Sequence, residues 1–292
     1  MRHRILNVAW FGIVFFLLSG VAAAQGAGAA RKQAESSMLL KGDIDIAVDG
    51  SVEQVSFERE EKIPSRLVSF VRQAAMQWKF EPILQGDAPV AAHAPMSVRL
   101  VADKLENGDY RIHITSASFG KYDPDDRTAV RFQKQTPPRY PTNAVRARVA
   151  GDVYAVVKVG PDGRVLDVEA EQVNLHGVAS ESAMRKWRDV LARSSQQAIR
   201  DWTFLVPSEG QDVGKPYWVV MVPISYRLSN SSAGQDDHYG KWESYIPGPR
   251  NFVPWREEEG AGQGSPDALA DGGVYMDGAH RGPRLLTPLD KG

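Results

Sequence analysis

The feature that most constrains the fold of this chain is an internal repeat in its sequence. Three short motifs occur twice, in the same order. They are Gly-Asp at the start of a strand-turn-strand pattern (42–57 and 151–173), Trp-x-Phe (78–80 and 202–204) and Pro-x-Ser-x-Arg-Leu (95–100 and 223–228). Ordered self-similarity of this kind indicates that one structural unit is present twice. We therefore expect two small domains of the same kind.

Each copy of the repeat predicts a β-hairpin, a helix and a returning strand. In the first copy, apolar residues alternate over 44–48 before Asp49-Gly50, a pair typical of two-residue hairpin turns. Apolar residues at helical spacing follow over 64–78 and, in a longer form, over 177–202 of the second copy. The predicted fold class is α+β, with two ββαβ domains that each pack an antiparallel sheet on an amphipathic helix.

Composition excludes several classes of site. Among 292 residues, 35 basic side chains face 36 acidic ones, so the chain lacks the positive field that nucleic-acid binding requires. The absence of cysteine excludes disulfides, thiolate nucleophiles and zinc-thiolate sites. The six histidines are scattered, without the spacing of a metal motif. We expect no nucleic-acid partner, no metal and no cofactor.

The amino terminus predicts export. A basic start, "MRHR", precedes an apolar run and an Ala-x-Ala pattern that ends at Ala24. This order is typical of a secretory signal peptide over 1–24. The alternative is an uncleaved inner-membrane anchor, because residues 5–24 are about long enough to cross a bilayer. Both interpretations place the rest of the chain outside the cytoplasm, and we favour a cleaved, periplasmic protein.

Composition also suggests how the rest of the chain is organised. Residues 25–39 are small and polar and are expected to form a flexible tether, and the charged, proline-containing stretch 118–135 a linker. These limits leave domains at 40–117 and 136–229. The tail, 230–292, is rich in Gly, Pro and Asp and is expected to be disordered. Within it, 239–255 interleaves aromatics with proline, which suits either a partner-binding segment or a strap on the protein's own surface.

A set of ordered motifs in the second copy resembles the carboxy-terminal domain of TonB energy transducers. The set comprises Tyr140-Pro141 before a short helix at 142–149, Gly151 before the first strand, Val159–Val165 at the hairpin, Trp202–Phe204, and the Gly214–Pro216 turn before the last strand. The resemblance covers 136–229 and extends more faintly to 40–101, which is identified as a degenerate copy. Independently of the resemblance, Gly151 is expected to take a positive φ angle as the chain leaves the helix.

The resemblance implies a binding module that captures an extended segment of an outer-membrane receptor, or of another periplasmic protein, by adding it to a sheet edge. The last strand is the candidate edge. Its predicted partner-binding residues are Tyr217, Trp218, Val219, Val220, Met221, Val222, Ile224, Tyr226 and Arg227. The alternative is that this strand pairs within the protein or with a second copy in self-association. Arg139, Tyr140 and Pro141 form a stiff leading arm before the domain.

The chain departs from a complete energy transducer. Such a protein has an uncleaved anchor, with a histidine that couples to an inner-membrane motor, and a long proline-rich spacer. Here His3 lies outside the apolar run and a second domain copy stands in place of the spacer. Membrane-anchored transport function is therefore the alternative, with a motor as partner only if the amino terminus stays uncleaved.

An exported enzyme is the rival from another class. "DPDD" at 123–126 lacks the glycine and the final carboxylate of a calcium loop. "GPDG" at 160–163 lacks the Lys-Ser/Thr of a phosphate loop. We predict no catalytic residues.

Overall fold

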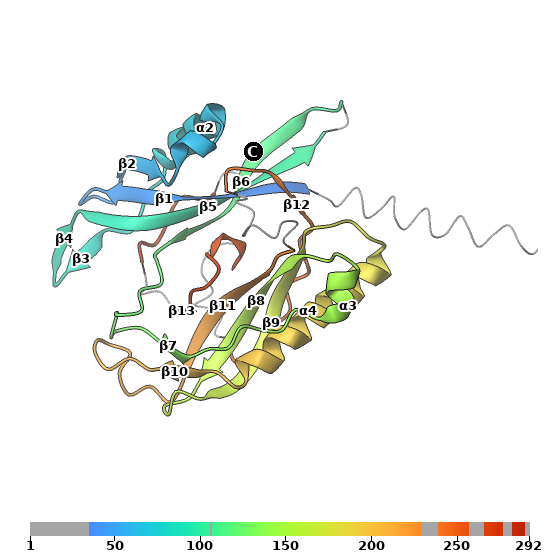
Figure 1. Ribbon diagram of the computed structural model, residues 1–292. Coiled ribbons are helices and arrows are strands. Elements are labelled where there is room, and N and C mark those ends of the chain that lie inside the picture. The colour runs from blue at the N-terminus through green and yellow to red at the C-terminus, as the bar shows by residue number, and fades with distance from the viewer. Residues whose placement is uncertain (1–34, 106, 229–238, 257–265, 277–281, 290–292) are drawn as a thin grey trace, which may run out of the picture.

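The computed structural model describes residues 35–105, 107–228, 239–256, 266–276 and 282–289. The fold is mixed α+β with mostly antiparallel sheets, which confirms the predicted class. Two larger sheets face each other, and segments of the carboxy-terminal tail run between them (Figure 1). The predicted signal peptide and the first part of the predicted tether, up to residue 34, lie outside the described residues.

The first sheet is built from the amino-terminal half of the described chain. The elements of this half are β1 (Glu35–Ile46), β2 (Val52–Phe57), η1 (Glu60–Lys62), α2 (Ser65–Ala75), β3 (Ile83–Gln85), β4 (Ala88–Val90), β5 (Ala92–Lys104) and β6 (Tyr110–Phe119). In the sheet, β1 pairs with β2 and β5, and β5 pairs with β6. Leu67 and Val71 of α2 lie in one hydrophobic core with Ile44 and Phe80, as the helical spacing predicts.

The second sheet is built from strands in the part of the chain after residue 119. The elements of this half are β7 (Arg131–Lys134), α3 (Thr142–Arg146), β8 (Gly151–Val159), β9 (Val165–Leu175), α4 (Glu181–Ile199), β10 (Thr203–Leu205) and β11 (Trp218–Tyr226). β8 lies between β9 and β11, and α4 covers one face (Figure 1). Met184, Leu191 and Ile199 of α4 are buried in a second core that also contains Trp202 and Phe204.

The two hairpins have the same turn. In the first, the N–H of Gly50 donates to the Ala47 carbonyl and the N–H of Ala47 to the Ser51 carbonyl. Only the glycine takes a positive φ angle, 82° for Gly50 and 74° for its counterpart Gly163. These turns therefore have one left-handed residue, as in a hairpin with a glycine bulge, and not the two that were predicted.

A matching backbone contact closes each turn onto the chain after the helix. The N–H of Phe80 donates to the Gly50 carbonyl at 2.7 Å, and that of Phe204 donates to the Gly163 carbonyl at 2.8 Å. A Cβ at either glycine would collide with the carbonyl oxygen of the same phenylalanine. In each copy of the repeat, the glycine of the Asp-Gly motif thus contacts the phenylalanine of the Trp-x-Phe motif, which explains why the two motifs occur together twice.

Three predicted details are wrong. Gly151 does not take the positive φ angle; Arg148 does, at 52°. Glycine is needed at 151 for another reason, because a Cβ there would collide with the Asn174 carbonyl. β1 begins at Glu35, inside the stretch expected to be a tether. β7 lies inside the predicted linker, where Phe132 packs against Trp202 and Phe204.

The tail was predicted to be disordered, and its described parts are ordered instead. β12 (Glu243–Tyr245) pairs with β1, η3 (Pro266–Ala268) contacts β5 and β6, and β13 (Tyr275–Met276) pairs with β11. Leu285 enters the first core. The compositional rule asks whether a segment can bury enough apolar surface by itself. This tail buries some of its apolar side chains, among them Val253, Val274 and Leu285, in clusters that also contain residues of the two sheets. The interpretation of 239–255 as a strap is therefore confirmed.

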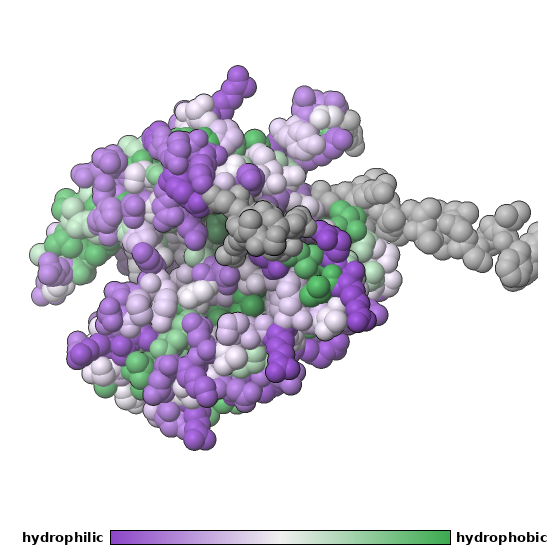
Figure 2. All heavy atoms as spheres, viewed as in Figure 1, coloured by the Kyte–Doolittle hydropathy of each residue, from purple (hydrophilic) through white to green (hydrophobic). Residues whose placement is uncertain are grey.

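No helix in the described part of the chain combines the length and the apolar character needed to cross a membrane. The visible surface is mainly hydrophilic, with hydrophobic residues at the end of the β3–β4 hairpin (Figure 2). Leu84 at this hairpin is 61% exposed.

Candidate partner-binding edge

β11, the predicted edge strand, is paired on both sides for part of its length. One side pairs with β8 from Trp218–Val159 to Tyr226–Gly151. The other side pairs with β13 at Val220–Met276 and Met221–Tyr275. The strand therefore lies at the edge of the β9-β8-β11 meander, and the tail covers that edge over two residues.

Ser225 reveals the direction in which β11 presents its outer backbone groups. Its N–H donates to the carboxylate of Asp271 in the tail. Successive residues of an antiparallel strand direct their N–H and C=O groups to opposite neighbours. Residues 219, 221, 223 and 225 therefore face away from β8. Pro223, which has no N–H to donate, falls at one of these outward positions, where proline is tolerated.

The side chains of β11 alternate between two apolar layers. Those on the α4 side lie in the second core; they are Trp218, Val220, Val222, Ile224 and Tyr226. Val219 and Met221 lie on the opposite face, against Val253 and Trp255 of the tail. Most of the predicted partner-binding side chains are thus core residues. Tyr217, Val219 and Arg227 remain partly exposed. A partner at this edge would bind mainly through the backbone.

The leading arm docks on the domain that it precedes. The Tyr140 hydroxyl donates to the Val149 carbonyl at 2.5 Å. The Tyr140 ring packs edge-on against Tyr226 at 5.2 Å between centroids. The Arg139 carbonyl accepts a hydrogen bond from Ser194 Oγ at 2.6 Å, and Pro141 caps α3. These contacts of the arm therefore help to hold α3 and α4 to the sheet.

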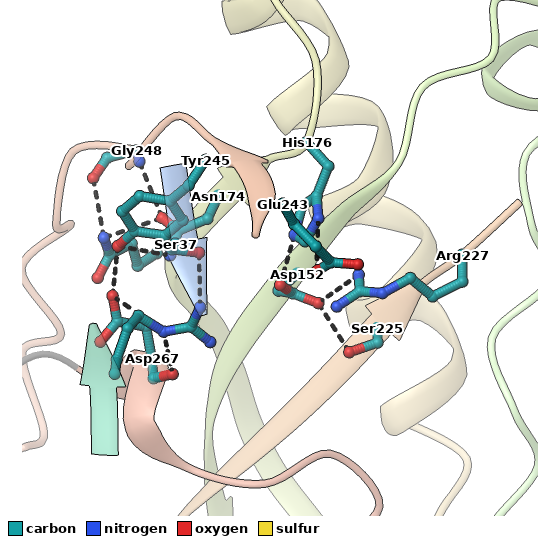
Figure 3. Close-up of polar contacts among 12 residues, drawn as sticks. Ser37, Asp152, Asn174, His176, Ser225, Arg227, Glu243, Tyr245, Gly248 and Asp267 are labelled. Atoms are coloured by element: carbon teal, nitrogen blue, oxygen red, sulfur yellow. Dashed lines mark hydrogen bonds and ion pairs between the residues drawn. The ribbon is translucent and has the colours of Figure 1, made fainter. Parts of the chain in front are cut away.

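Arg227, at the end of the predicted edge, belongs to a buried charge cluster around Asp152 of β8 (Figure 3). Arg227 Nη1 donates to Asp152 Oδ1 at 2.8 Å, and Ser225 Oγ donates to the same oxygen at 2.7 Å. The His176 Nε2 atom lies 2.7 Å from Asp152 Oδ2, and its Nδ1 atom lies 3.5 Å from Glu243 of β12. One histidine therefore joins the second sheet to the tail.

The charges of this cluster shift one another's ionisation. Burial raises the pKa of Asp152, but His176 and Arg227 outweigh it, so the pKa lies well below its usual range. Burial lowers the pKa of His176, but Asp152 and Glu243 outweigh this and raise the pKa above its usual value. Asp152 is thus ionised, and His176 has a carboxylate at each ring nitrogen. Both hydrogen-bond best to a doubly protonated imidazole.

A second buried cluster holds η3 against the first sheet (Figure 3). Arg99 Nε donates to the Asp267 carbonyl at 2.7 Å, and Ser116 Oγ donates to the Asp267 carboxylate at 2.5 Å. Tyr245 of β12 donates to the other carboxylate oxygen. Each partner comes from a different element, so the cluster stabilises the tail in one position.

Ser225 donates to Asp152 and not to His176, so the hydroxyl is not paired with a base. Within the described ranges, no group of three His, Cys, Asp or Glu side chains could hold a metal ion.

The tail residues at β11 were missed by sequence reasoning, although a signal for them exists. The runs 153–157, "VYAVV", and 218–222, "WVVMV", are apolar without alternation. Such runs are typical of strands that are buried on both faces. α4 covers one face, so a second covering layer could have been predicted. Its identity could not, because the tail has no periodic apolar pattern of its own.

Comparison of this chain with protein-family models, with curated proteins and with solved structures found no match.

Proposed function

We propose that this protein is an exported binding module that accepts an extended segment of a partner protein by strand addition to the β11 edge. The observation that carries the proposal is the pairing of β11. One side is fully engaged by β8, whereas on the other side the described residues pair with β11 only at Val220 and Met221. Unpaired backbone groups along an edge are a template for another strand.

The rigidity of the strand supports this role. β11 is held along its length by β8, and its side chains lie in a core with α4. A preorganised edge loses little conformational entropy when a partner strand docks, so more of the interaction energy contributes to affinity. Only the partner segment would become ordered on binding, as in other cases of strand addition.

The motif resemblance supports a partner of a particular kind. In TonB-like domains the added strand comes from an outer-membrane receptor, and the predicted signal peptide would deliver this chain to the same compartment. We propose two TonB-like ββαβ units, of which the second carries the edge. The shared Gly50–Phe80 and Gly163–Phe204 contacts support the equivalence of the two units. An outer-membrane receptor or another periplasmic protein is the proposed partner.

The test is binding of a partner segment to variants of the outward-facing residue Val219. Periplasmic proteins captured by the full chain would be mapped to a short peptide, and that peptide titrated against V219P and the matched control V219A. Proline removes the outward N–H and adds a clash, so we expect V219P to weaken binding at least about tenfold. V219A keeps the N–H and should weaken it about twofold.

Equal affinity of both variants for every captured segment would overturn the proposal. Circular dichroism and the urea midpoint of V219P must match those of V219A, because this N–H faces away from β8 and takes no part in the β8–β11 ladder.

A further inference from the structure

β13 is short, and its side chains alternate as those of a true sheet strand do. Val274 and Met276 pack into the core on the α4 side, whereas Tyr275 packs with Val253 and Leu269 on the opposite face. Two apolar side chains thus enter one layer and an aromatic ring enters the other. The β11 edge is therefore flanked by two apolar layers that together accept an apolar-aromatic-apolar triplet.

The tail reproduces other parts of strand docking at the same edge. The Asp271 carboxylate accepts the outward N–H of Ser225. The Tyr275 hydroxyl donates to the Ala270 carbonyl at 3.0 Å, and the Met276 sulfur accepts the Val130 N–H at 3.1 Å. Backbone pairing, side-chain packing and a capping carboxylate together satisfy the edge as a partner segment would.

The hold of β13 on the edge is nevertheless small. Among the described residues it spans two, and Gly273 and Val274, which continue toward Pro223, form no strand pairs with β11; β6 in contrast covers the corresponding edge of β5 from Met96–Phe119 to Lys104–Tyr110. The stability of strand addition grows with the number of ladder bonds and filled pockets. A longer segment with the same three side chains would continue the pairing to Pro223, where the described tail forms no strand pair, and so displace β13.

We propose that β13 is an internal occupant of the partner-binding edge, and that the partner is an extended segment whose side chains match Val274, Tyr275 and Met276. This inference rests on the proposed function and adds its regulation and its specificity. In the free protein the tail shields the edge from unwanted strands. A partner with an apolar-aromatic-apolar triplet, antiparallel to β11, replaces it.

The absence of cysteine allows a direct test by a reversible lock. Val220 and Met276 lie opposite each other, and Val220 directs its N–H to β8, so they form a pair without mutual hydrogen bonds. Such pairs bring the Cα atoms to about 4.5 Å, which suits a disulfide. The double variant Val220→Cys with Met276→Cys would fix β13 when oxidised and release it to exchange when reduced.

The probe is a synthetic peptide with the sequence of residues 270–276, ADGGVYM, added to the full chain and followed by fluorescence anisotropy. We expect the oxidised lock to abolish probe binding and reduction to restore it. The matched control is Ser36→Cys with Ser244→Cys, a pair between β1 and β12 that fixes the tail elsewhere. Its oxidation should leave probe binding unchanged.

A releasing variant keeps the inference falsifiable if the lock perturbs folding. Val274→Asp with Met276→Asp should expel β13 from the apolar layer and raise probe affinity about tenfold or more, because the edge is then vacant in most molecules. Leu286→Asp makes the same change at an exposed tail position and should leave affinity as in the unmodified chain.

The outcomes separate the two proposals. If the releasing variant binds the probe no better than the unmodified chain, or if the oxidised lock binds it as well as the reduced form, the internal occupant is refuted. If a partner peptide loses affinity in V219P but binds the oxidised lock normally, only this inference fails. If the probe behaves as expected while no periplasmic segment binds, the proposed function fails and the internal occupant stands.

Discussion

β5 and β11 occupy the same place in the two copies of the repeat, and they differ in what covers their outer edge. β6 follows β5 directly in the chain and pairs with it along most of its length. Among the described residues, β11 is covered on its outer side by a two-residue strand from the distant tail. A neighbouring strand joined by a short turn closes an edge permanently, because little loop entropy opposes the pairing. A short strand from a distant segment can be exchanged.

The outward prolines emphasise this comparison. The Pro95 carbonyl accepts the N–H of Gly120 just after β6. Pro223 occupies the outward side of β11 in the same motif. The two units thus present similar edges, and the first shows what a fully added strand looks like. Binding function is expected in the second unit alone.

The largest difference in mutational destabilisation between the two copies is expected at the aspartate that follows the first glycine of each, Asp43 and Asp152. Asp152 is buried with His176 and Arg227, whereas Asp43 has a side chain that is 43% exposed. D152N should destabilise the protein by about 3–5 kcal/mol, because it leaves buried cations without their counter-ion. D43N should cost about 0–1 kcal/mol. Urea unfolding of both variants measures the difference.

Similar losses for D152N and D43N would contradict the assignment of the buried cluster as the main electrostatic difference between the units.

The two turn glycines are expected to behave alike. G50A and G163A each place a Cβ on a left-handed residue and against a phenylalanine carbonyl. Each should destabilise its unit by about 1–3 kcal/mol, the range for backbone strain of this kind. Thermal unfolding would measure both. A loss at one glycine without a comparable loss at the other would break the structural equivalence of the copies. G86A, at a left-handed glycine with open space around it, controls for the φ angle alone.

The smallest expected difference concerns two histidines that each lie between carboxylates. The hydrogen bond that the His93 ring donates to the Asp45 carboxylate raises the pKa of this exposed histidine, and the pKa of His176 is raised in its buried cluster. A raised folded pKa means that the stabilisation is complete below the unfolded value of 6.5 and is lost as pH rises through the folded pKa. Stability should therefore fall above pH 6.5, and H176Q should flatten this fall much more than H93Q, because solvent screens the exposed pairs of His93.

Glu35 provides the control for this pH profile. Burial, with Asp103 and Asp267, raises its pKa to about 7. Its ionisation therefore also lowers stability, but between about pH 4.5 and 7. The urea midpoints of H176Q, H93Q and E35Q between pH 5 and 9 separate the groups. A profile of H176Q that matches the unmodified chain above pH 7 would exclude His176 as the titrating group.

Much of the fold could be predicted from local patterns. The hairpins at 42–57 and 151–173, the helices before the Trp-x-Phe motifs and the α+β class each depend on residues close in sequence, whose spacing or backbone preferences act without the rest of the chain. Turn geometry was less accurate. Asp49 does not join Gly50 in the left-handed region, and Arg148 takes the strained angle that was assigned to Gly151. Both backbone conformations depend on contacts that the strand after each turn makes with residues distant in sequence.

The candidate edge shows where such prediction stops. The sequence by itself determined that residues 218–226 form a strand and that one set of motifs occurs twice, and the unbroken apolar run of this strand contains a signal for cover on both faces. Only the tertiary structure decided that Tyr275 and Met276 cover the β11 edge, that Glu243 reaches His176, and that Asp267 reaches Arg99. The physical reason is that these tail residues have no regular pattern and little intrinsic order. They gain their stability from surfaces and charges that exist only after the two sheets have formed.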